Sequence, residues 1–352
     1  MNSHRVLYIS AESNQISGGT AVMKRNLDLL KKVPNVAVYE YRVPMQSKIL
    51  AFFSCLFGGN FILSGRNEKM ILNKIRSEQF DCVFQEGTTS GHLAESLHKN
   101  GVKLVVFAHN VEKLLYQERY RSYKYNVLEA LKYWSIKSNE KKSVAFADIL
   151  IALTKRDSNN FVTYYGRKAD VVMPISFEAR EIKKLCPTKN QEYLLFVGSN
   201  FFPNVEGMNW FIKNVIPFVN INVKIVGSCC NGIIPPPENL SSKIELLGIV
   251  ENLNDLYLNA MGVIAPIFKG SGMKTKTIEA MSYGKTIFGT DECFQGIECD
   301  YNKIGGLCNT ANEFIEKIND YSGGPYNEYT KSLFDNYYSN EAVQEKFNNI
   351  FK

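Results

Sequence analysis

The stretch VIAPIFKGSGMKTKTIEAM, residues 263–281, contains three successive patterns. An apolar run at Gly262–Pro266 predicts a buried strand, because short runs of this kind are typical of parallel sheets. Gly270, Ser271 and Gly272 follow, and two glycines around a serine allow the backbone to approach a ligand closely. A helix is expected from about Met273. Strand, glycine loop and helix in this order predict one unit of an α/β fold.

The same alternation of short apolar runs and longer helical stretches continues along the whole chain. It predicts parallel sheets that are covered by helices on both faces. We therefore expect an α/β fold with two Rossmann-like, doubly wound domains. The expected strands are residues 5–10, 36–42, 80–84, 102–108, 149–153 and 170–173 in the first half, and 193–198, 223–227, 243–247, 262–266 and 286–289 in the second.

The chain length also favours two domains, because 352 residues exceed what one hydrophobic core usually organises. Residues 179–192 are polar, carry Pro187 and fit a surface linker. We place an N-terminal domain at residues 1–182 and a second domain at residues 183–328. Apolar residues at helical spacing in 329–352 predict a C-terminal helix that could pack back on the N-terminal domain.

The composition excludes several classes of protein. The net charge of +6 is modest and the basic residues are scattered, so charge gives no support for nucleic-acid binding. The eight cysteines show no C-x-x-C pair and are too few for a disulfide scaffold, which predicts reduced thiols. The amino terminus, MNSHRVLYIS, lacks the layout of a secretory signal. We expect a cytoplasmic protein.

Two segments of the sequence each have two interpretations. Residues 49–63 are the most hydrophobic of the chain but are shorter than the roughly 20 residues of a spanning helix. They form either a core helix or an apolar patch that docks on a membrane. Basic and aromatic residues crowd 116–142, which is either a packed and solvated helical face or a surface for an anionic bilayer or a lipid-diphosphate acceptor. The second interpretations together predict contact with the inner face of the plasma membrane.

Charged residues follow Gly272 in a pattern that favours a bound anion. Lys274 and Lys276 lie in the first turn of the expected helix, where the helix dipole disfavours cations. A diphosphate explains them better than helix stability does. Glu279 lies further along the same helix and can accept two hydrogen bonds from a ribose diol. The alternative is a solvated helix face with ordinary charges, and the neighbouring glycines favour the site.

Two further loops open helices and are weaker candidates when taken alone. Gly198 and Ser199 end an expected strand in front of the helical stretch 205–215, where free backbone amides favour anions. The sequence SGGT at residues 17–20 precedes a helix that is expected from Ala21. Gly18 and Gly19 could therefore approach phosphates or an acceptor closely.

One of the four histidines is a site candidate. His109 directly follows an expected strand, in the sequence HNVE, and is well placed to touch a ligand. A histidine held in a polar network is the usual alternative. No metal cluster can be assembled from the four histidines.

Several of these segments resemble the retaining glycosyltransferases of family four, also called glycosyl transferases group 1. The similarity is specific at residues 269–290 (KGSGMKTKTIEAMSYGKTIFGT) and 194–211 (LLFVGSNFFPNVEGMNWF), and the first segment matches the branch P-x-x-x-G-S-G-M-K-x-K-x-x-E-A-M. Residues 109–112, 139–161 and 245–257 are more loosely similar. The resemblance implies the GT-B fold, in which two domains face each other across a cleft. The nucleotide-sugar donor would bind the second domain, and the acceptor would mainly meet the first.

The resemblance also implies roles for individual residues. Glu279 would hold the ribose, residues 272–275 the diphosphate and His109 the transferred sugar, while Ile249 and Val250 would contact the base. The donor-binding residues implied in this way are Gly18, Gly19, Gly198, Ser199, Ile249, Val250, Gly270, Ser271, Gly272, Met273, Lys274, Thr275 and Glu279, with His109, Lys274 and Glu279 as the catalytic candidates.

Two departures from the family pattern affect the expected chemistry. Ser271 stands where the family's E-x7-E motif has its first glutamate, and Ser199 stands where an arginine is common. Lys274 is then the main candidate for neutralising the departing diphosphate. The implied mechanism is front-face transfer with retention, which needs neither a protein nucleophile nor a divalent metal and depends on positioning and charge stabilisation.

The resemblance therefore implies a hexosyltransferase-type enzyme without a cofactor. Its donor would be a UDP-sugar or a GDP-sugar and its acceptor a saccharide or a lipid-linked saccharide, with bacterial surface polysaccharide biosynthesis as the expected context. One alternative is a non-catalytic nucleotide-sugar-binding or scaffold protein, which the serine at position 271 favours. Another is a GT-B sugar-nucleotide epimerase, for which we find no suitable set of acids and a histidine.

Overall fold

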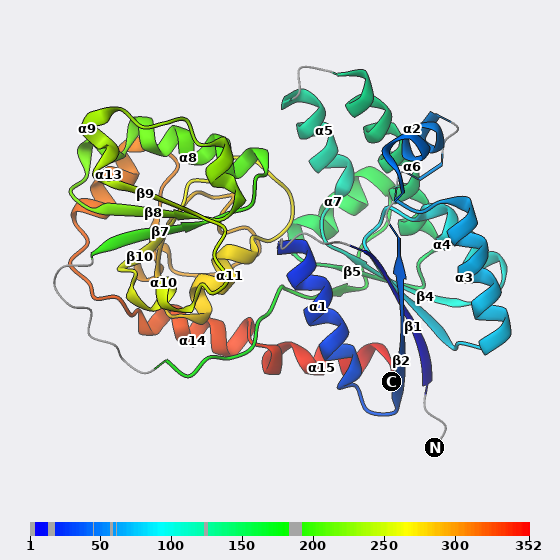
Figure 1. Ribbon diagram of the computed structural model, residues 1–352. Helices are drawn as coiled ribbons and strands as arrows, with labels where there is room; N and C mark the ends of the chain where they lie inside the picture. Colours follow the sequence, from blue (N-terminus) through cyan, green and yellow to red (C-terminus); the bar gives the residue numbers. More distant parts are fainter. Residues whose placement is uncertain are drawn as a thin grey trace. The chain divides into compact units, whose positions relative to one another are not determined.

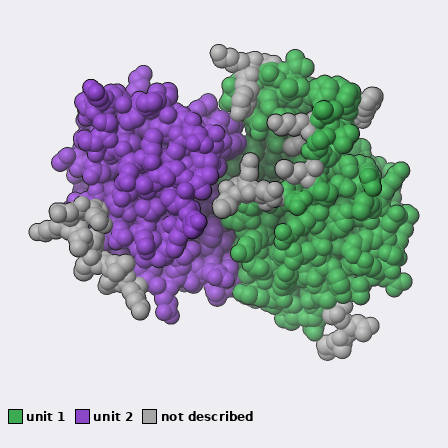
Figure 2. Space-filling view, viewed as in Figure 1, with its two compact units in different colours: residues 1–174, 271–273, 343–352 green, residues 175–270, 274–342 purple. Residues whose placement is uncertain are grey.

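The computed structural model divides into two compact units, which Figure 2 colours green and purple. Unit 1 comprises Met1–Pro174, Ser271–Met273 and Val343–Lys352, and unit 2 comprises Ile175–Gly270 and Lys274–Ala342. The structure describes residues 4–12, 18–44, 46–56, 59–60, 62–122, 126–182 and 192–352.

Within its described residues, unit 1 contains a six-stranded sheet in which each strand pairs in parallel with its neighbours. The strand order is β2-β1-β3-β4-β5-β6. Because β1 lies between β2 and β3, the chain order reverses at β1 and β3. The strands are β1 (His4–Ala11), β2 (Val36–Val43), β3 (Cys82–Glu86), β4 (Lys103–Ala108), β5 (Ile149–Ala152) and β6 (Val171–Val172).

Helices cover both faces of the unit 1 sheet (Figure 1). On one face lie α1 and the end of α15, where Phe347 stacks on Phe84 of β3 and Gln344 bonds the carbonyl of Leu29. On the other face, side chains of α3, α4, α6 and α7 pack with the strands into one buried apolar cluster. The helices are α1 (Gly18–Lys31), α2 (Lys48–Leu56), α3 (Gly65–Glu78), α4 (Gly91–Lys99), α5 (Glu112–Ser122), α6 (Val127–Phe146) and α7 (Lys155–Tyr165).

Unit 2 contains a second six-stranded parallel sheet, with the order β12-β11-β10-β7-β8-β9. Three of its strands, β7, β10 and β11, are almost completely buried, which explains their unbroken apolar runs, whereas the edge strand β9 is partly exposed. The strands are β7 (Tyr193–Val197), β8 (Asn222–Val226), β9 (Ile244–Gly248), β10 (Gly262–Ala265), β11 (Thr286–Gly289) and β12 (Gly305–Leu307).

The helices of unit 2 also form two layers (Figure 1). On one side lie α8 and α13, whose rings Phe211 and Phe314 meet edge to face, and on the other side lie α10, α11 and α14. The helices are α8 (Phe202–Asn214), α9 (Glu238–Ser241), α10 (Asn254–Asn259), α11 (Thr275–Ser282), α12 (Tyr301–Ile304), α13 (Ala311–Asn319) and α14 (Glu328–Tyr337). The helix α15 (Asn340–Ile350) begins in unit 2, and its residues from Val343 onward belong to unit 1. Two short 3₁₀ helices occupy Ile216–Phe218 and Ser228–Gly232.

The expected fold class is confirmed, because both sheets are parallel and both are covered by helices on two faces. Each of the eleven expected strands is present, with ends that differ by no more than two residues. The sequence did not predict β12, since the segment GGL is too short to show a periodic pattern.

The division into units differs from the expected boundary at residues 182 and 183. Unit 2 already begins at Ile175, where Ser176 bonds Asn340 and Phe177 forms a bridge with Ser339. Residues 183–191 lie outside the described part of the chain. The expected single C-terminal helix is two helices, α14 and α15, and Val343–Lys352 group with unit 1.

Candidate functional site

The strand order of unit 2 identifies the edge of the sheet where a ligand is expected. β7 and β10 are neighbours, and the chain continues from them to helices on opposite faces of the sheet. In open α/β sheets, ligands bind at the carboxyl ends of the strands where the strand order reverses. The loop after β7 carries Gly198 and Ser199, and the loop after β10 leads through Gly270 to Lys274 and α11.

Asn204 of α8 connects these two candidate segments. Its side-chain amide donates to the carbonyl oxygen of Ser199 (2.9 Å), and its Oδ1 accepts from Lys276 Nζ (2.6 Å). Near it, a Cβ at Gly207 would lie 1.9 Å from the carbonyl oxygen of Pro266, so α8 approaches the loop after β10 at closest range there. The fold therefore brings together two segments that lie more than sixty residues apart in the sequence.

The helix after the glycine loop begins at Thr275, two residues later than expected, with Lys274 in extended conformation as its N-cap. Gly270 and Gly272 have φ values of +139° and +67°, which explains the choice of glycine at both positions. Ser271, Gly272 and Met273 are grouped with unit 1, where Ser271 Oγ accepts a hydrogen bond from the backbone N–H of Val111 (3.3 Å).

The two lysines of this segment differ in their surroundings. Lys274 Nζ forms an ion pair with Glu292 Oε1 (2.6 Å), and both side chains are about seven-eighths buried, at 13% and 14% exposure. Lys276 lies with its Nζ over the ring of Phe196 (4.1 Å) and donates to Asn204. Burial lowers the pKa of Lys276 to about 7. Asn204 and Phe196 explain Lys276 without a bound anion, which leaves Lys274 as the candidate cation.

Glu279 is not the ordinary exposed helix charge that was the alternative interpretation. Its carboxylate accepts a hydrogen bond from Tyr257 (3.3 Å), and Tyr257 stacks on Tyr283 with ring centroids 4.6 Å apart. Arg180 lies over the Tyr283 ring at 4.4 Å. Burial raises the pKa of Glu279, and Arg180 and Tyr257 oppose this shift. Sequence analysis did not identify the two tyrosines or Arg180, because Arg180 and Tyr257 lie far from Glu279 along the chain.

Ile249 and Val250 follow the end of β9, at the same edge of the sheet as Gly198 and Lys274. Gly248 has a φ of +65°, and its carbonyl accepts from the N–H of Gly227, which holds the ends of β8 and β9 together. The Ile249 side chain is 74% exposed. An exposed apolar side chain at this edge can pack against a planar ligand group.

Unit 1 holds His109 in a polar network at the ends of β3 and β4. His109 Nε2 lies 2.5 Å from Glu86 Oε2, and the Glu86 side chain is only 1% exposed. The other carboxylate oxygen of Glu86 accepts from Tyr8 (2.7 Å) and from Asn26 (2.9 Å). Sequence reasoning missed Glu86, whose one signal is an acid at the carboxyl end of a buried strand.

A second buried acid fixes the loop that carries His109. Glu140 of α6 accepts from the backbone N–H groups of Glu112 (2.7 Å) and Lys113 (2.9 Å), at the start of α5. Thr88 and Tyr165 donate to the same carboxylate. Burial raises the pKa of Glu140 to about 7.

Gly18 and Gly19 lie in the first turn of α1, whereas the sequence predicted a loop there and a helix from Ala21. Ser17 of the same motif lies outside the described residues. The two glycines thus belong to the amino-terminal turn of a helix that follows β1, one of the two strands at which the order of this sheet reverses. In that position their backbone N–H groups have no carbonyl of a preceding turn within the helix.

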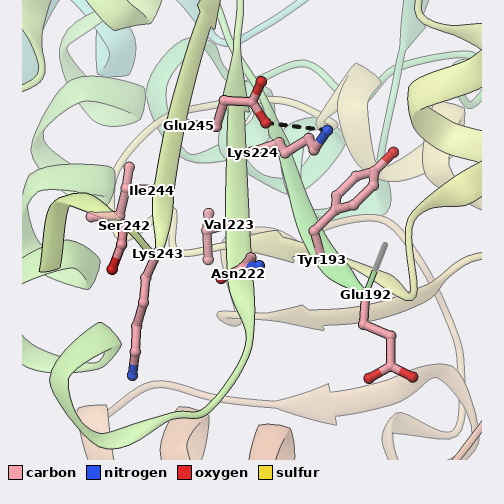
Figure 3. Close-up of a pocket in the computed structure, with 9 residues that line it drawn as sticks. All are labelled: Glu192, Tyr193, Asn222, Val223, Lys224, Ser242, Lys243, Ile244 and Glu245. Atoms are coloured by element: carbon pink, nitrogen blue, oxygen red, sulfur yellow. Dashed lines mark ion pairs between the residues drawn. The ribbon is translucent and has the colours of Figure 1, made fainter. Parts of the chain in front are cut away.

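A cavity of about 420 Å³ opens at the other end of the unit 2 sheet (Figure 3). It lies where β7, β8 and β9 begin, at Tyr193, Asn222 and Ile244, and the ion pair between Lys224 and Glu245 (3.2 Å) borders it. Because ligands of such sheets bind at the carboxyl ends of the strands, this cavity is not the candidate site. None of the residues predicted for the site lines it.

The segment at residues 49–63 is not a core helix. Its helix, α2, exposes Ile49 (71%), Leu50 (62%) and Phe53 (52%), whereas Cys55 and Leu63 are buried. Residues 57, 58 and 61 lie outside the described chain. In the part of the chain that the structure describes, no helix has both the length and the apolar character needed to cross a membrane.

The segment at residues 116–142 fits the packed and solvated interpretation in part. Arg119 and Lys132 both pair with Glu129, at 2.7 and 2.8 Å, and Tyr120 stacks on Tyr133. Trp134, in contrast, is largely exposed. Residues 123–125 lie outside the described part of the chain.

Comparisons with known proteins agree with this architecture. A structure of sucrose-phosphate synthase from Thermosynechococcus elongatus is similar, with a TM-score of 0.70, 12% identity, and coverage of 99% of this chain and 98% of that one. WaaG, a glycosyltransferase involved in lipopolysaccharide biosynthesis, gives a TM-score of 0.68, 14% identity, and coverage of 98% and 99%. HepE of Anabaena in complex with UDP-glucose gives a TM-score of 0.66, 12% identity, and coverage of 99% of both chains. No match was found among curated proteins.

At these identities the solved structures establish the fold, which is GT-B. Residues 191–321, most of unit 2, match the family described as Glycosyl transferases group 1. This match covers the candidate segments after β7, β9 and β10. The family match thus covers a large part of unit 2, whereas the likeness to the solved structures extends over the whole chain and concerns the fold.

Proposed function

We propose that this protein transfers a sugar, with retention, from a UDP-sugar or a GDP-sugar to a saccharide or a lipid-linked saccharide. The observation that carries the proposal is the carboxyl edge of the unit 2 sheet. There, a glycine loop with two left-handed residues precedes a helix amino terminus and a largely buried lysine. These features suit a diphosphate, because backbone N–H groups, the helix dipole and an ammonium group all favour negative charge.

Each part of the donor then has a candidate partner in unit 2. The start of α11, with Lys274 and Thr275, would hold the diphosphate, and Glu279 would accept hydrogen bonds from the ribose hydroxyls. Ile249 and Val250 would contact the base. Gly198 and Ser199 would line the same edge, with Gly198 close to the backbone of Gly227. The complexes of HepE with UDP and with UDP-glucose support this class of donor.

Unit 1 would meet the transferred sugar and the acceptor. His109, held by Glu86, would contact the sugar, and Gly18 and Gly19 would lie beneath the phosphates. In the proposed step the bond between the anomeric carbon and the diphosphate oxygen breaks, and a bond to the acceptor oxygen forms on the same face. The acceptor proton passes to the leaving diphosphate. Catalysis would rest on positioning and on stabilisation of the departing charge, without a metal.

The proposal is tested by following the release of nucleoside diphosphate from a panel of UDP-sugars and GDP-sugars. Lys274→Ala should abolish transfer and leave the protein folded, because Lys274 neutralises the charge that develops on the leaving group. Lys213→Ala, which removes one exposed lysine from the last turn of α8, is the matched control. Unchanged turnover of Lys274→Ala would overturn the assignment. Slow release without acceptor separates an enzyme from a non-catalytic binder, and the recovered sugar reveals an epimerase by its configuration.

We further propose that the protein acts in the cytoplasm at the inner face of the plasma membrane. The supporting observation is α2, which exposes Ile49, Leu50 and Phe53 and packs on α6, whose Lys141 is exposed. An exposed apolar helix that packs on a helix with an exposed lysine suits an anionic bilayer. Sedimentation with anionic liposomes should show binding at low salt that falls at high salt and is weaker for Phe53→Ser. Absence of binding at low salt would rule out the contact.

A further inference from the structure

A carboxylate lies beside the lysine that we assign to the diphosphate. Glu292 Oε1 is 2.6 Å from Lys274 Nζ, and both side chains are largely buried. A Cβ at Gly270 would lie 3.4 Å from Lys274 Nζ and 3.6 Å from Glu292 Oε1, so the backbone of the glycine loop borders this ion pair.

The position of Glu292 is fixed by the loop that carries it. This loop follows β11, the neighbour of β10, and therefore lies at the same carboxyl edge of the sheet. On one side of Glu292, Thr290 Oγ1 donates to the carbonyl oxygen of Ile267, in the loop after β10. On the other side, Cys293 accepts at its carbonyl oxygen from Thr277 of α11 (3.0 Å). Contacts with both segments of the candidate site hold this loop in place, and Lys274 holds the carboxylate.

A fixed negative charge at this position opposes the binding of a diphosphate. It neutralises Lys274, and it repels phosphate oxygens that approach the start of α11. The carboxylate is consistent with an anion site if the ligand also carries hydroxyl groups that donate to it. The hydroxyl groups of a nucleoside diphosphate belong to the ribose, on the nucleoside side of the diphosphate. A nucleotide sugar carries several more hydroxyls on the sugar ring that is attached to the second phosphate.

From this arrangement we propose that Glu292 binds hydroxyl groups of the transferred sugar and so distinguishes the nucleotide sugar from the bare diphosphate. In the absence of donor it pairs with Lys274; with donor, Lys274 holds the phosphate and Glu292 the sugar. The inference rests on the proposed function and deepens it. It also supplies an acid beside the loop in which residue 271 is a serine.

The test compares two dissociation constants in each protein. Isothermal titration calorimetry of the wild type first measures Kd for two pairs of ligands, UDP with UDP-glucose and GDP with GDP-mannose. The pair that binds the wild type is then used for all variants. In Glu292→Gln, the preference for the nucleotide sugar over the diphosphate should fall by about tenfold or more, the usual effect of losing a hydrogen bond to a charged group. The affinity for the bare diphosphate should stay equal or rise, because a repelling charge is removed.

Two further variants serve as controls for effects of the substitution on folding. Asp291→Asn removes a neighbouring exposed carboxylate that bonds Asn309, and it should leave both constants unchanged. Glu292→Asp keeps the charge with a shorter reach, and it should keep the affinity for the diphosphate while losing part of the preference. A Glu292→Gln variant in which both constants change by the same factor would show that Glu292 only pairs with Lys274, and would overturn the inference. If the wild type binds neither diphosphate nor nucleotide sugar, both the inference and the proposed function are wrong.

Discussion

Gly207→Ala should destabilise unit 2, although alanine is the better helix former. Gly207 lies inside α8, where the exchange by itself would stabilise the helix by about 1 kcal/mol. The new Cβ, however, would lie 1.9 Å from the carbonyl oxygen of Pro266, and this neighbour is backbone that cannot rotate away. Forcing packed backbone apart costs up to about 3 kcal/mol. We therefore expect a net loss of about 2 kcal/mol, or roughly 4–8 °C in the Tm of a domain of this size.

The assay is thermal unfolding of the whole chain by scanning calorimetry, in which the two units can unfold separately. The transition of unit 2 should move down and that of unit 1 should stay. Binding of UDP or GDP should also weaken, because the loop after β10 must shift. The control is Gly65→Ala at the first residue of α3, where a Cβ meets nothing within 4 Å, so its stability should be equal or higher. A Gly207→Ala protein as stable as the wild type would refute the close packing of α8 on this loop.

Three further predictions concern buried polar groups. Burial lowers the pKa of Lys276 to about 7 from 10.5. Above pH 7 the lysine of the unfolded chain therefore keeps a proton that the lysine of the folded chain has lost. The free energy of unfolding should then rise from pH 7 to about 10, by up to about 1.4 kcal/mol per pH unit. Urea unfolding of Lys276→Met should show a smaller rise, with a residual part from Lys285, and an identical rise in both proteins would contradict the burial. Glu86→Gln should slow transfer about 10- to 100-fold, because it releases His109. The increase in Tm caused by UDP or GDP should stay unchanged, and its loss would contradict the assignment of Glu86 to the positioning of His109. Glu140→Leu leaves two backbone N–H groups and two hydroxyls without their acceptor. It should lower the stability of unit 1 by about 3 kcal/mol or more in calorimetry, whereas Glu140→Gln should cost less. A leucine variant as stable as the wild type would show that the network contributes little.

The strands could be predicted from the sequence because parallel strands buried on both faces are unbroken apolar runs. The Gly305–Leu307 strand could not, since its three residues include two glycines and pair only at the edge of the sheet. The boundary between the units was harder to predict for a different reason. Contacts between residues 176–177 and 339–340 decide that Ile175 belongs to unit 2, and such long-range contacts leave no local pattern.

The candidate site divides in the same way. Gly270, Gly272 and Lys274 form one contiguous motif, and the sequence marks them through positive-φ glycines beside a helix start. Lys276 looked equivalent to Lys274 in the sequence, because the two share one helical turn. Only the contacts of Lys276 with Asn204 of α8 and with the Phe196 ring of β7 separate them. Glu292 and Glu86 escaped notice because an acid at the end of a strand has no distinctive neighbours in the sequence.

The central claim is that the start of α11 binds the diphosphate of a nucleotide sugar. Its most direct test is a crystal structure of the protein with whichever of UDP or GDP raises the Tm more. We expect the diphosphate at the backbone N–H of Thr275 and at Lys274 Nζ, with the ribose on Glu279 and the base beside Ile249. A nucleotide bound in the cavity at the amino ends of β7–β9, or on unit 1 alone, would contradict it.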